Sequence, residues 1–147
     1  MPSIYKYQRI ITPGPNGTTL YFRNNDGNEA TELCEFDGWW YVSVPDGTVM
    51  PEQWPEIGWQ AVDVTPELKE RIIKRSRVMQ LIYQRMQAMI RAEYELEDEL
   101  YFARIGVGVA NGVYVFEPGE QEKMLAYGAF VETVRQWGRT ERAKYLP

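Results

Sequence analysis

Residues 33–44 read Leu-Cys-Glu-Phe-Asp-Gly-Trp-Trp-Tyr-Val-Ser-Val, and this stretch decides the fold of the N-terminal half. Asp37-Gly38 suits a two-residue type I′ turn, because both central residues of that turn need a positive φ angle. The flanking residues are largely aromatic or β-branched, which favours strands. We therefore predict a β-hairpin with three facing pairs: Phe36 with Trp39, Cys34 with Tyr41, and Leu33 with Val42.

Both faces of this hairpin carry apolar side chains, since successive residues of a strand point to opposite sides of the sheet. The adjacent Trp39 and Trp40 must therefore lie on opposite faces. A sheet that is apolar on both faces has to be covered on both, by a second sheet, by helices or by another subunit. The hairpin thus predicts a layered fold, a partner, or both.

Turn-forming residues divide the rest of the N-terminal half into short strands. Residues 4–11 and 18–23 are rich in β-branched and aromatic side chains, and a glycine- and proline-containing turn follows the first of them. Residues 49–64 contain Pro51 and Pro55, which favour an irregular or edge segment. We expect a β-rich module over residues 1–64.

A helix start marks the second half, expected to be a helical module over residues 65–147. Thr65 can cap a helix, and Pro66 fits the first turn. We predict one long helix over residues 66–94, a second over 95–104, a loop or short strand over the glycine-containing residues 105–112, and a last helix beginning at 117–120. The expected fold class is α+β: an antiparallel β-rich half followed by a helical hairpin or small bundle.

Apolar residues of the long helix recur at a 4-3-4-3 spacing, which is typical of a coiled-coil or helical-hairpin seam. The pattern continues to Leu96 and Leu100. Arg75 and Glu93 interrupt it, and further apolar residues widen it, so a bundle is expected. We predict that six residues form an oligomer seam: Leu68, Ile72, Met79, Ile82, Met86 and Met89.

Composition argues against catalysis. The 147 residues include no histidine and one cysteine, Cys34, so the commonest general base and a thiolate metal site are both excluded. We expect no enzyme, no cofactor, no metal and no small-molecule substrate. The alternative is an enzyme using paired carboxylates, for which Glu97 and Asp98 in the acidic run 93–99 are candidates. A solvated helix surface explains that run more simply.

Charge and hydropathy bear on the class of partner. The net charge is −5, with −6 up to Thr65 and +1 from Pro66 onward, so neither half is basic enough to predict binding of nucleic acid. Basic residues between 69 and 77 are expected to pair with the acidic N-terminal half or with another subunit. No apolar run approaches the ~20 residues of a membrane span, so no membrane partner is expected.

Aromatic residues are the candidate binding groups. Flat aromatic rings anchor protein interfaces and also bind sugars, whereas core packing is the ordinary role of such residues. Because Trp39 and Trp40 point to opposite faces, at least one of them should contact something outside a single core. We predict a protein partner, in preference to a glycan, for five residues: Trp39, Trp40, Tyr41, Trp54 and Trp59.

Two helical stretches resemble small tail-region proteins of tailed bacteriophages. They are residues 90–100, Ile-Arg-Ala-Glu-Tyr-Glu-Leu-Glu-Asp-Glu-Leu, and residues 134–144, Val-Arg-Gln-Trp-Gly-Arg-Thr-Glu-Arg-Ala-Lys. The resemblance implies a minor virion protein of the tail or its attachments, or else a tail-fibre assembly chaperone. Glu95 stands where those proteins favour a helix-capping serine, so a helix break at Tyr94 is not clearly predicted.

The resemblance also implies partners and a location. A protein of this kind is a homo-oligomer that binds other phage structural proteins through large surfaces. It is made in the host cytoplasm and ends in the virion. A carbohydrate-binding module is the remaining alternative, carried by the tryptophans.

Overall fold

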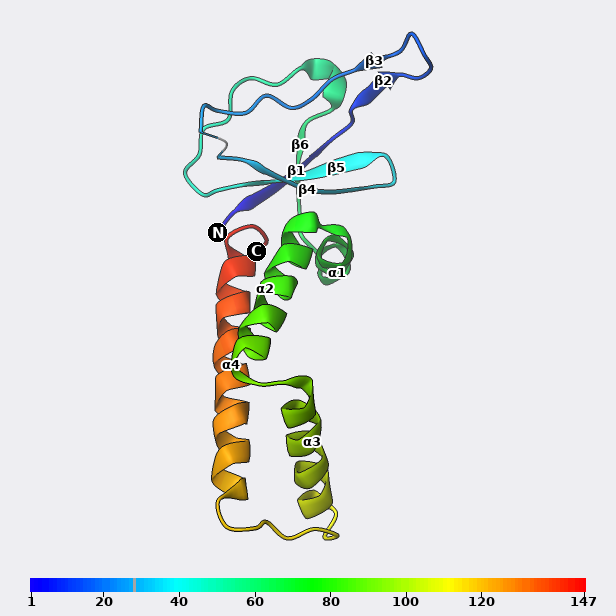
Figure 1. The fold of residues 1–147 in the computed structure, drawn as a ribbon. Helices are drawn as coiled ribbons and strands as arrows, with labels where there is room; N and C mark the ends of the chain where they lie inside the picture. Colours follow the sequence, from blue (N-terminus) through cyan, green and yellow to red (C-terminus); the bar gives the residue numbers. More distant parts are fainter. Residues whose placement is uncertain (28) are drawn as a thin grey trace. The chain divides into compact units, whose positions relative to one another are not determined.

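The computed structural model describes residues 1–27 and 29–147, and it confirms the α+β class. Short antiparallel strands come first, and α-helices follow (Figure 1). Two compact units are present, Met1–Leu81 with Thr140–Pro147, and Ile82–Arg139. The change from strands to helices near Thr65 is therefore a change of secondary structure within the first unit.

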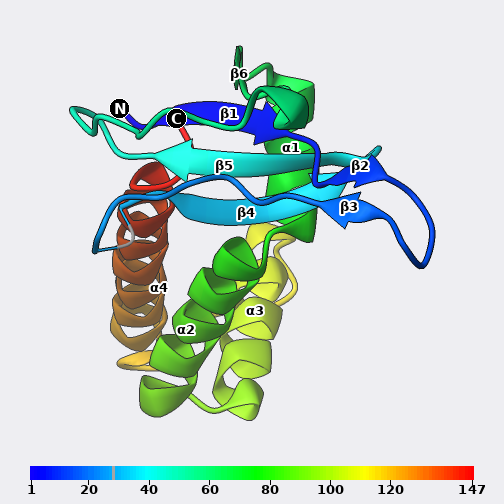
Figure 2. The same cartoon turned by 90° about the horizontal axis from the view of Figure 1, so that it is seen from above.

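Four antiparallel strands form the main sheet of the first unit. Their order across the sheet is β4-β5-β1-β6 (Figure 2). The strands are β1 (Ser3–Tyr7), β4 (Thr31–Phe36), β5 (Trp39–Val44) and β6 (Gln60–Val62). The proline-containing segment before β6 forms a 3₁₀ turn at Pro55–Ile57 and then an edge strand, as predicted.

The central hairpin is confirmed, with one correction in its register. Asp37 and Gly38 have φ angles of 55° and 78°, as the tight turn requires. Phe36 pairs with Trp39 and Cys34 with Tyr41, but Glu32 rather than Leu33 lies opposite Val42. The prediction of Leu33 with Val42 was wrong because a β-bulge between Glu32 and Cys34 inserts one residue into β4.

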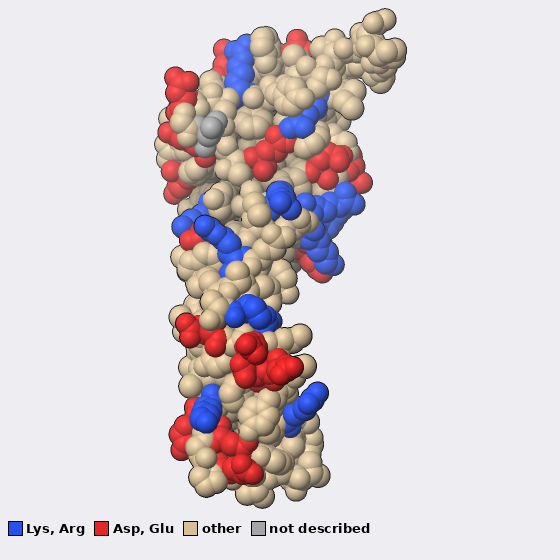
Figure 3. All heavy atoms as spheres, viewed as in Figure 1, with Lys and Arg blue, Asp and Glu red and all other residues tan. Residues whose placement is uncertain are grey.

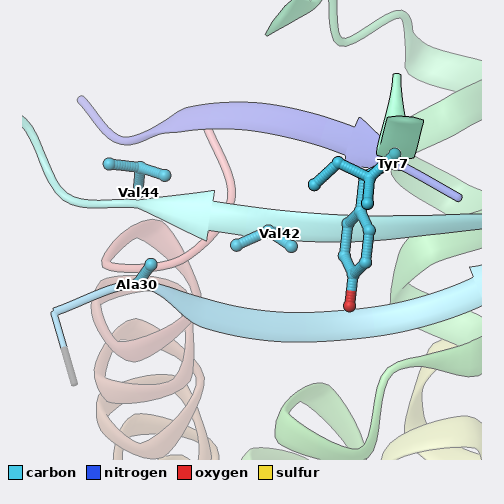
Figure 4. Close-up of a cluster of buried hydrophobic side chains, with 5 residues drawn as sticks. Tyr7, Ala30, Val42 and Val44 are labelled. Atoms are coloured by element: carbon cyan, nitrogen blue, oxygen red, sulfur yellow. The ribbon is translucent and has the colours of Figure 1, made fainter. Parts of the chain in front are cut away.

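Both faces of the sheet are covered by the same chain. On one face Tyr7, Val42 and Val44 form a buried cluster with Ala30 and Ile57 (Figure 4), and the loop side chains Leu20, Phe22, Met50 and Trp59 pack against it. On the other side α1 (Pro66–Arg75) contacts β4, and Arg71 lies 4.2 Å from the centre of the Phe36 ring. Of the covers expected from sequence, a helix is found on one side, whereas the loops that cover the other face were not among them.

A two-stranded arm extends from the first unit. It consists of β2 (Ile10–Thr12) and β3 (Thr18–Thr19), joined by an exposed turn over residues 13–17. Residues 10–22 carry no charge, and the projecting arm of Figure 1 is entirely tan in Figure 3. The arm therefore offers uncharged, largely β-branched surface to solvent.

The predicted long helix is interrupted. Thr65 caps α1 as expected, because its Oγ1 accepts a hydrogen bond of 3.2 Å from the Leu68 N–H. Helix α1 ends at the buried Ser76, whose ψ of 127° is extended, and α2 (Arg77–Glu93) follows at once. The single helix over residues 66–94 was thus wrong: Ser76 leaves the helical conformation, and its Oγ accepts a 3.4 Å hydrogen bond from the Met79 N–H of α2.

The glycine-containing segment is helical, against expectation. Helix α3 (Leu96–Ala110) continues through Gly106 and Gly108, and α4 (Glu120–Ala143) begins where predicted. Gly106 faces the Met124 sulfur, at 3.3 Å from an added Cβ, so close tertiary packing offsets the low helix propensity of glycine. The break before α3 does form, and the Glu95 N–H donates a 3.0 Å hydrogen bond to Asp98 Oδ2.

Candidate protein-protein interface

The predicted oligomer seam lies largely inside the chain. Ile72, Met79 and Ile82 are buried, whereas Leu68, Met86 and Met89 are half-buried. Within the second unit Met86 packs directly against Gly138 of α4, where a Cβ would collide with the methionine side chain. The three buried residues contribute to the core of this chain and are not accessible to a second one as they stand.

All five predicted aromatic binding residues lie in the first unit, and two of them, Tyr41 and Trp59, stack on other aromatic rings. Tyr41 is buried and stacks on Phe36, with the ring centres 4.5 Å apart. Trp59 is half-buried and stacks on Tyr5 at 4.8 Å and on Phe22 at 5.8 Å. These rings belong to the packing of the sheet.

The other three tryptophans each hold a cation over the ring. Lys6 lies 4.3 Å from the ring centre of Trp39, Arg9 lies 3.4 Å from that of Trp40, and Arg23 lies 3.7 Å from that of Trp54. These three cations are all of the basic residues before Thr65. One face of each ring, which a sugar would need for stacking, is therefore already occupied.

Arg9 connects the parts of the first unit around Trp40. Its Nε donates a 3.0 Å hydrogen bond to the Tyr7 hydroxyl, and its Nη2 pairs with the Glu32 carboxylate. Burial raises the pKa of Glu32, although the guanidinium of Arg9 acts in the opposite direction. Burial likewise raises the pKa of Tyr7. Through Tyr7, Glu32 and Trp40, Arg9 connects β1, β4 and β5. Its guanidinium is thus hydrogen-bonded and charge-paired within the chain.

Two of the basic residues of α1 bind the acidic N-terminal half, as the charge pattern predicts, while Lys74 pairs with Glu70 of α1 itself. Arg71 Nη2 lies 2.9 Å from Asp37 Oδ2, and Arg75 Nη1 donates a 3.4 Å hydrogen bond to the Glu35 carbonyl oxygen. Acidic and basic side chains are interspersed on the face drawn in Figure 3. This part of α1 is thus engaged within its own unit.

In the second unit an aromatic cluster fixes the inner face of α3. Phe102 stacks on Tyr127 of α4 with ring centres 5.2 Å apart, and Tyr94 lies edge-on to Tyr127 at 5.0 Å. The Tyr127 hydroxyl donates a 2.7 Å hydrogen bond to Glu99, which also pairs with Arg91 at 2.8 Å. Burial, then the hydrogen bond to Glu99, raises the pKa of Tyr127 to about 12, and the same bond lowers the pKa of Glu99.

A buried carboxylate holds the segment between α3 and α4. Glu120 accepts hydrogen bonds from the hydroxyls of Tyr101 and Tyr114 and, at 2.7 Å, from the Glu117 N–H. It is 8 % exposed, and it occupies the first turn of α4, where negative charge is favourable. These bonds tie the turn over residues 111–119 to both helices.

The outer face of α3 is apolar and exposed. Leu96, Leu100 and Val107 are 58 %, 45 % and 60 % exposed. On the same face, Ala103 lies between Leu100 and Val107, and Ala110 follows Val107. We call these five residues the α3 stripe. Val113 and Val115 of the following turn are more exposed still.

The first turn of α3 is acidic, but from Leu100 onward the helix is apolar on nearly all sides and covered on one. From residue 100 to residue 116 Arg104 is the single charged residue, and Ile105 and Gly108 are buried on the inner face. A helix that is apolar all round is ordinarily buried all round. A contiguous apolar patch of this kind marks an interaction surface in proteins that fold stably. The α3 stripe is therefore the best candidate interface in the described part of the chain.

The remaining sequence candidates are the carboxylates of the acidic run 93–99. Two carboxylates of the acidic run are engaged by different partners: Asp98 accepts the Glu95 N–H, and Glu99 binds Tyr127. Across residues 1–27 and 29–147, no three histidine, cysteine or acidic side chains are grouped so as to hold a metal ion. Within the same residues, no helix has the length and apolar character needed to span a membrane.

Comparison with known proteins gave no relative: no family model, no curated protein and no solved structure matches this chain.

Sequence reasoning placed Leu96 and Leu100 in the heptad pattern but missed the rest of the α3 stripe, because it ended the helix at Arg104. The signal was present in the spacing, since Leu96, Leu100, Ala103, Val107 and Ala110 continue the 4-3-4-3 pattern through the glycines. Glycine at 106 and 108 outweighed that pattern in the prediction.

Proposed function

We propose that this chain is a non-enzymatic assembly protein of a tailed bacteriophage virion, a structural part of the tail or its attachments. It acts through protein-protein contacts with other phage structural proteins and with further copies of itself. The observation that carries the proposal is the α3 stripe, an exposed apolar face on a helix whose opposite side packs on α4. The likeness of residues 90–100 and 134–144 to tail-region proteins supports the choice of tail.

The uncharged arm gives the proposal a second contact surface. Residues 12–19 are exposed on both strands and on the turn, and Ile10 is 68 % exposed. A projecting two-stranded ribbon has unpaired edges that can add to a neighbouring sheet. In this proposal the arm contacts a different tail protein, and the helices hold copies of the chain together.

A tail-fibre assembly chaperone is the alternative within the same class. It would use the same surfaces but leave once the fibre has formed. The discriminating experiment is quantitative mass spectrometry of purified particles of the phage that encodes this chain. A fixed number of copies per particle supports the virion proposal. Absence from particles, together with misfolded fibres when the gene is deleted, would establish the chaperone.

The role of the α3 stripe in assembly is tested by Val107→Asp. A carboxylate at this exposed position leaves the core intact but makes burial against a partner costly. We expect fewer copies of the variant in particles. Val49→Asp is the matched control, because Val49 is an exposed valine of the first unit, outside the stripe. If both variants are incorporated into particles equally, the α3 stripe is not an assembly contact.

A further inference from the structure

The α3 stripe has the spacing of a coiled-coil seam. Its five residues are separated by four, three, four and three positions, and all five are exposed. Two helices with this repeat interlock when the side chains of one fit between those of the other. Along the stripe the two leucines, Leu96 and Leu100, come first, and the smaller residues Ala103, Val107 and Ala110 follow.

The helix that carries the stripe is already formed. Its inner face packs on α4 through Phe102 and Tyr127, and the Glu120 hydrogen bonds fix the segment beyond its C-terminal end. Docking therefore removes little of the conformational entropy that short free helices lose on pairing. A stripe on a helix of only 15 residues can act as an interface for this reason.

A second copy of α3 running antiparallel matches the stripe. A two-fold axis between Leu100 and Ala103 places Leu100 opposite Ala103 of the second copy, and Leu96 opposite its Val107. The same axis repeats both contacts with the copies exchanged, as an isologous interface requires. Every layer then sets a leucine against a smaller side chain, so the large side chains do not oppose one another.

The charges flanking the stripe fit the same arrangement. Glu97 and Arg104 each follow a stripe residue by one position, and both are exposed. Seven residues separate them, about 10 Å along the helix, too far for a direct pair within one chain. In the described part of the chain neither makes an ion pair or hydrogen bond. The two-fold axis brings Glu97 beside Arg104 of the second copy, twice.

A parallel arrangement of the two helices would form fewer new ion pairs. It would bring Glu99, not Glu97, toward Arg104 of the second copy. Glu99 is already engaged, by the Tyr127 hydroxyl at 2.7 Å and by Arg91 at 2.8 Å. Glu97 would stay unpaired, because the position it would face, residue 92, belongs to α2 and not to α3. The antiparallel arrangement is the one that leaves no flanking charge without a partner.

We propose that two copies of this chain associate through antiparallel α3 stripes, with Glu97 of each copy paired to Arg104 of the other. This inference rests on the proposed assembly function and names one of its partners, a second copy of the chain. It moves the self-association surface from the seam expected within residues 68–89 to α3, where the apolar residues are exposed.

Charge reversal tests the proposal with the full chain. Glu97→Arg and Arg104→Glu each replace two attractive contacts by two repulsive ones, so each should lower the association constant about tenfold. The double variant Glu97→Arg/Arg104→Glu should restore it, because the pairs are reversed in sign. Sedimentation velocity reads the mass directly, against 17.2 kDa for one chain.

Mixing the two single variants is the sharpest arm of the experiment. The Glu97→Arg chain carries arginine at both positions, and the Arg104→Glu chain carries glutamate at both. Each variant repels its own copies, but the two variants form two attractive pairs with one another. The mixture should therefore dimerise as wild type does. In a parallel pair or an unrelated interface, mixing would give no recovery, and that result would overturn the proposal.

Cysteine cross-linking tests the direction of the helices independently. Leu96→Cys and Val107→Cys chains should form a disulfide only when mixed, since residue 96 faces residue 107. Cys34 is buried and offers no competing thiol. Rapid homodimer formation by Leu96→Cys by itself would indicate parallel helices and contradict the proposal.

The second copy as partner and the assembly function can be refuted separately. If the wild-type chain stays monomeric at high concentration, the proposal that a second copy is the partner of the stripe is refuted. If Val107→Asp still reduces incorporation into particles in that case, the stripe binds another tail protein and the proposed function stands. Folding of each variant is checked by circular dichroism, with Val49→Asp as control.

Discussion

Gly108 of α3 lies so close to Tyr114 that a Cβ added to the glycine would be 2.8 Å from the Cβ of the tyrosine. The N–H groups of Val113 and Tyr114 both donate to the Gly108 carbonyl oxygen, at 2.9 and 3.2 Å. The turn after α3 therefore folds directly onto this glycine. Because a Cβ cannot rotate away from its backbone, Gly108→Ala should push the turn off the helix.

We expect Gly108→Ala to destabilise the second unit by about 1–3 kcal/mol, the usual range for overpacking a close contact. The measurement is urea unfolding, with hydrogen exchange of the Val113 and Tyr114 amides as the local probe. Gly128→Ala in α4 is the matched control. Among described residues nothing lies within 4 Å of an added Cβ at that position, so alanine should stabilise by about 0.5–1 kcal/mol. Similar gains from both variants would contradict this packing.

Glu120→Gln should weaken the junction of α3 and α4. The carboxylate accepts from Tyr101, Tyr114 and the Glu117 N–H, whereas an amide has one acceptor oxygen and would turn its NH₂ toward a donor. The expected loss is about 1–3 kcal/mol. Glu122→Gln, an exposed change in the same turn, should cost little. Equal melting temperatures for the two variants would show that the hydroxyl bonds contribute nothing.

The pair of Tyr127 and Glu99 predicts a loss of stability in alkaline solution. The folded pKa of Tyr127 is about 12, against 10.0 for an unperturbed tyrosine. Between those two pH values the unfolded chain releases a proton that the folded chain retains, so unfolding becomes more favourable as pH rises. The stabilisation is complete below pH 10.

The difference in unfolding free energy between wild type and Tyr127→Phe isolates this contribution, since the other tyrosines are common to both. We expect the difference to shrink as pH rises from about 10 to about 12. Glu99→Gln removes the carboxylate that accepts the phenol proton, and phenolate absorbance should then develop at lower pH. A difference that does not vary with pH would exclude the coupling.

Arg9→Ala should destabilise the first unit more than Arg23→Ala. Arg9 and Glu32 are 17 % and 27 % exposed, and loss of the guanidinium leaves a half-buried carboxylate unpaired, with its pKa raised further. We expect a cost of about 2 kcal/mol or more. Arg23 covers the exposed Trp54, and its loss should cost about 0.5–1 kcal/mol.

Urea unfolding followed by tryptophan fluorescence measures both arginine variants. Arg9→Lys should fall between wild type and Arg9→Ala, because an ammonium cannot bridge the Tyr7 hydroxyl and Glu32 with a planar fork. If Arg9→Lys and wild type unfold at the same urea concentration, the role of the guanidinium is only that of a positive charge.

The sequence by itself determined the features that depend on a few adjacent residues. Asp37-Gly38 specified the turn through positive φ angles, and Thr65 with Pro66 specified the start of α1. The β-rich and helical halves followed from local composition in the same way. These preferences act over a few residues and need no distant partner.

Tertiary structure decided the rest, because it depends on which surfaces meet. The bulge beside Leu33 and the break at Ser76 cannot be read from local preference. Gly108 stays helical because Tyr114 fills the space a side chain would need. Ile72, Met79 and Ile82 of the predicted seam are buried inside the chain, and the α3 stripe is exposed, so packing moved the candidate contact surface to α3. Spacing indicates that a helix face is apolar, but only packing determines whether the same chain covers it.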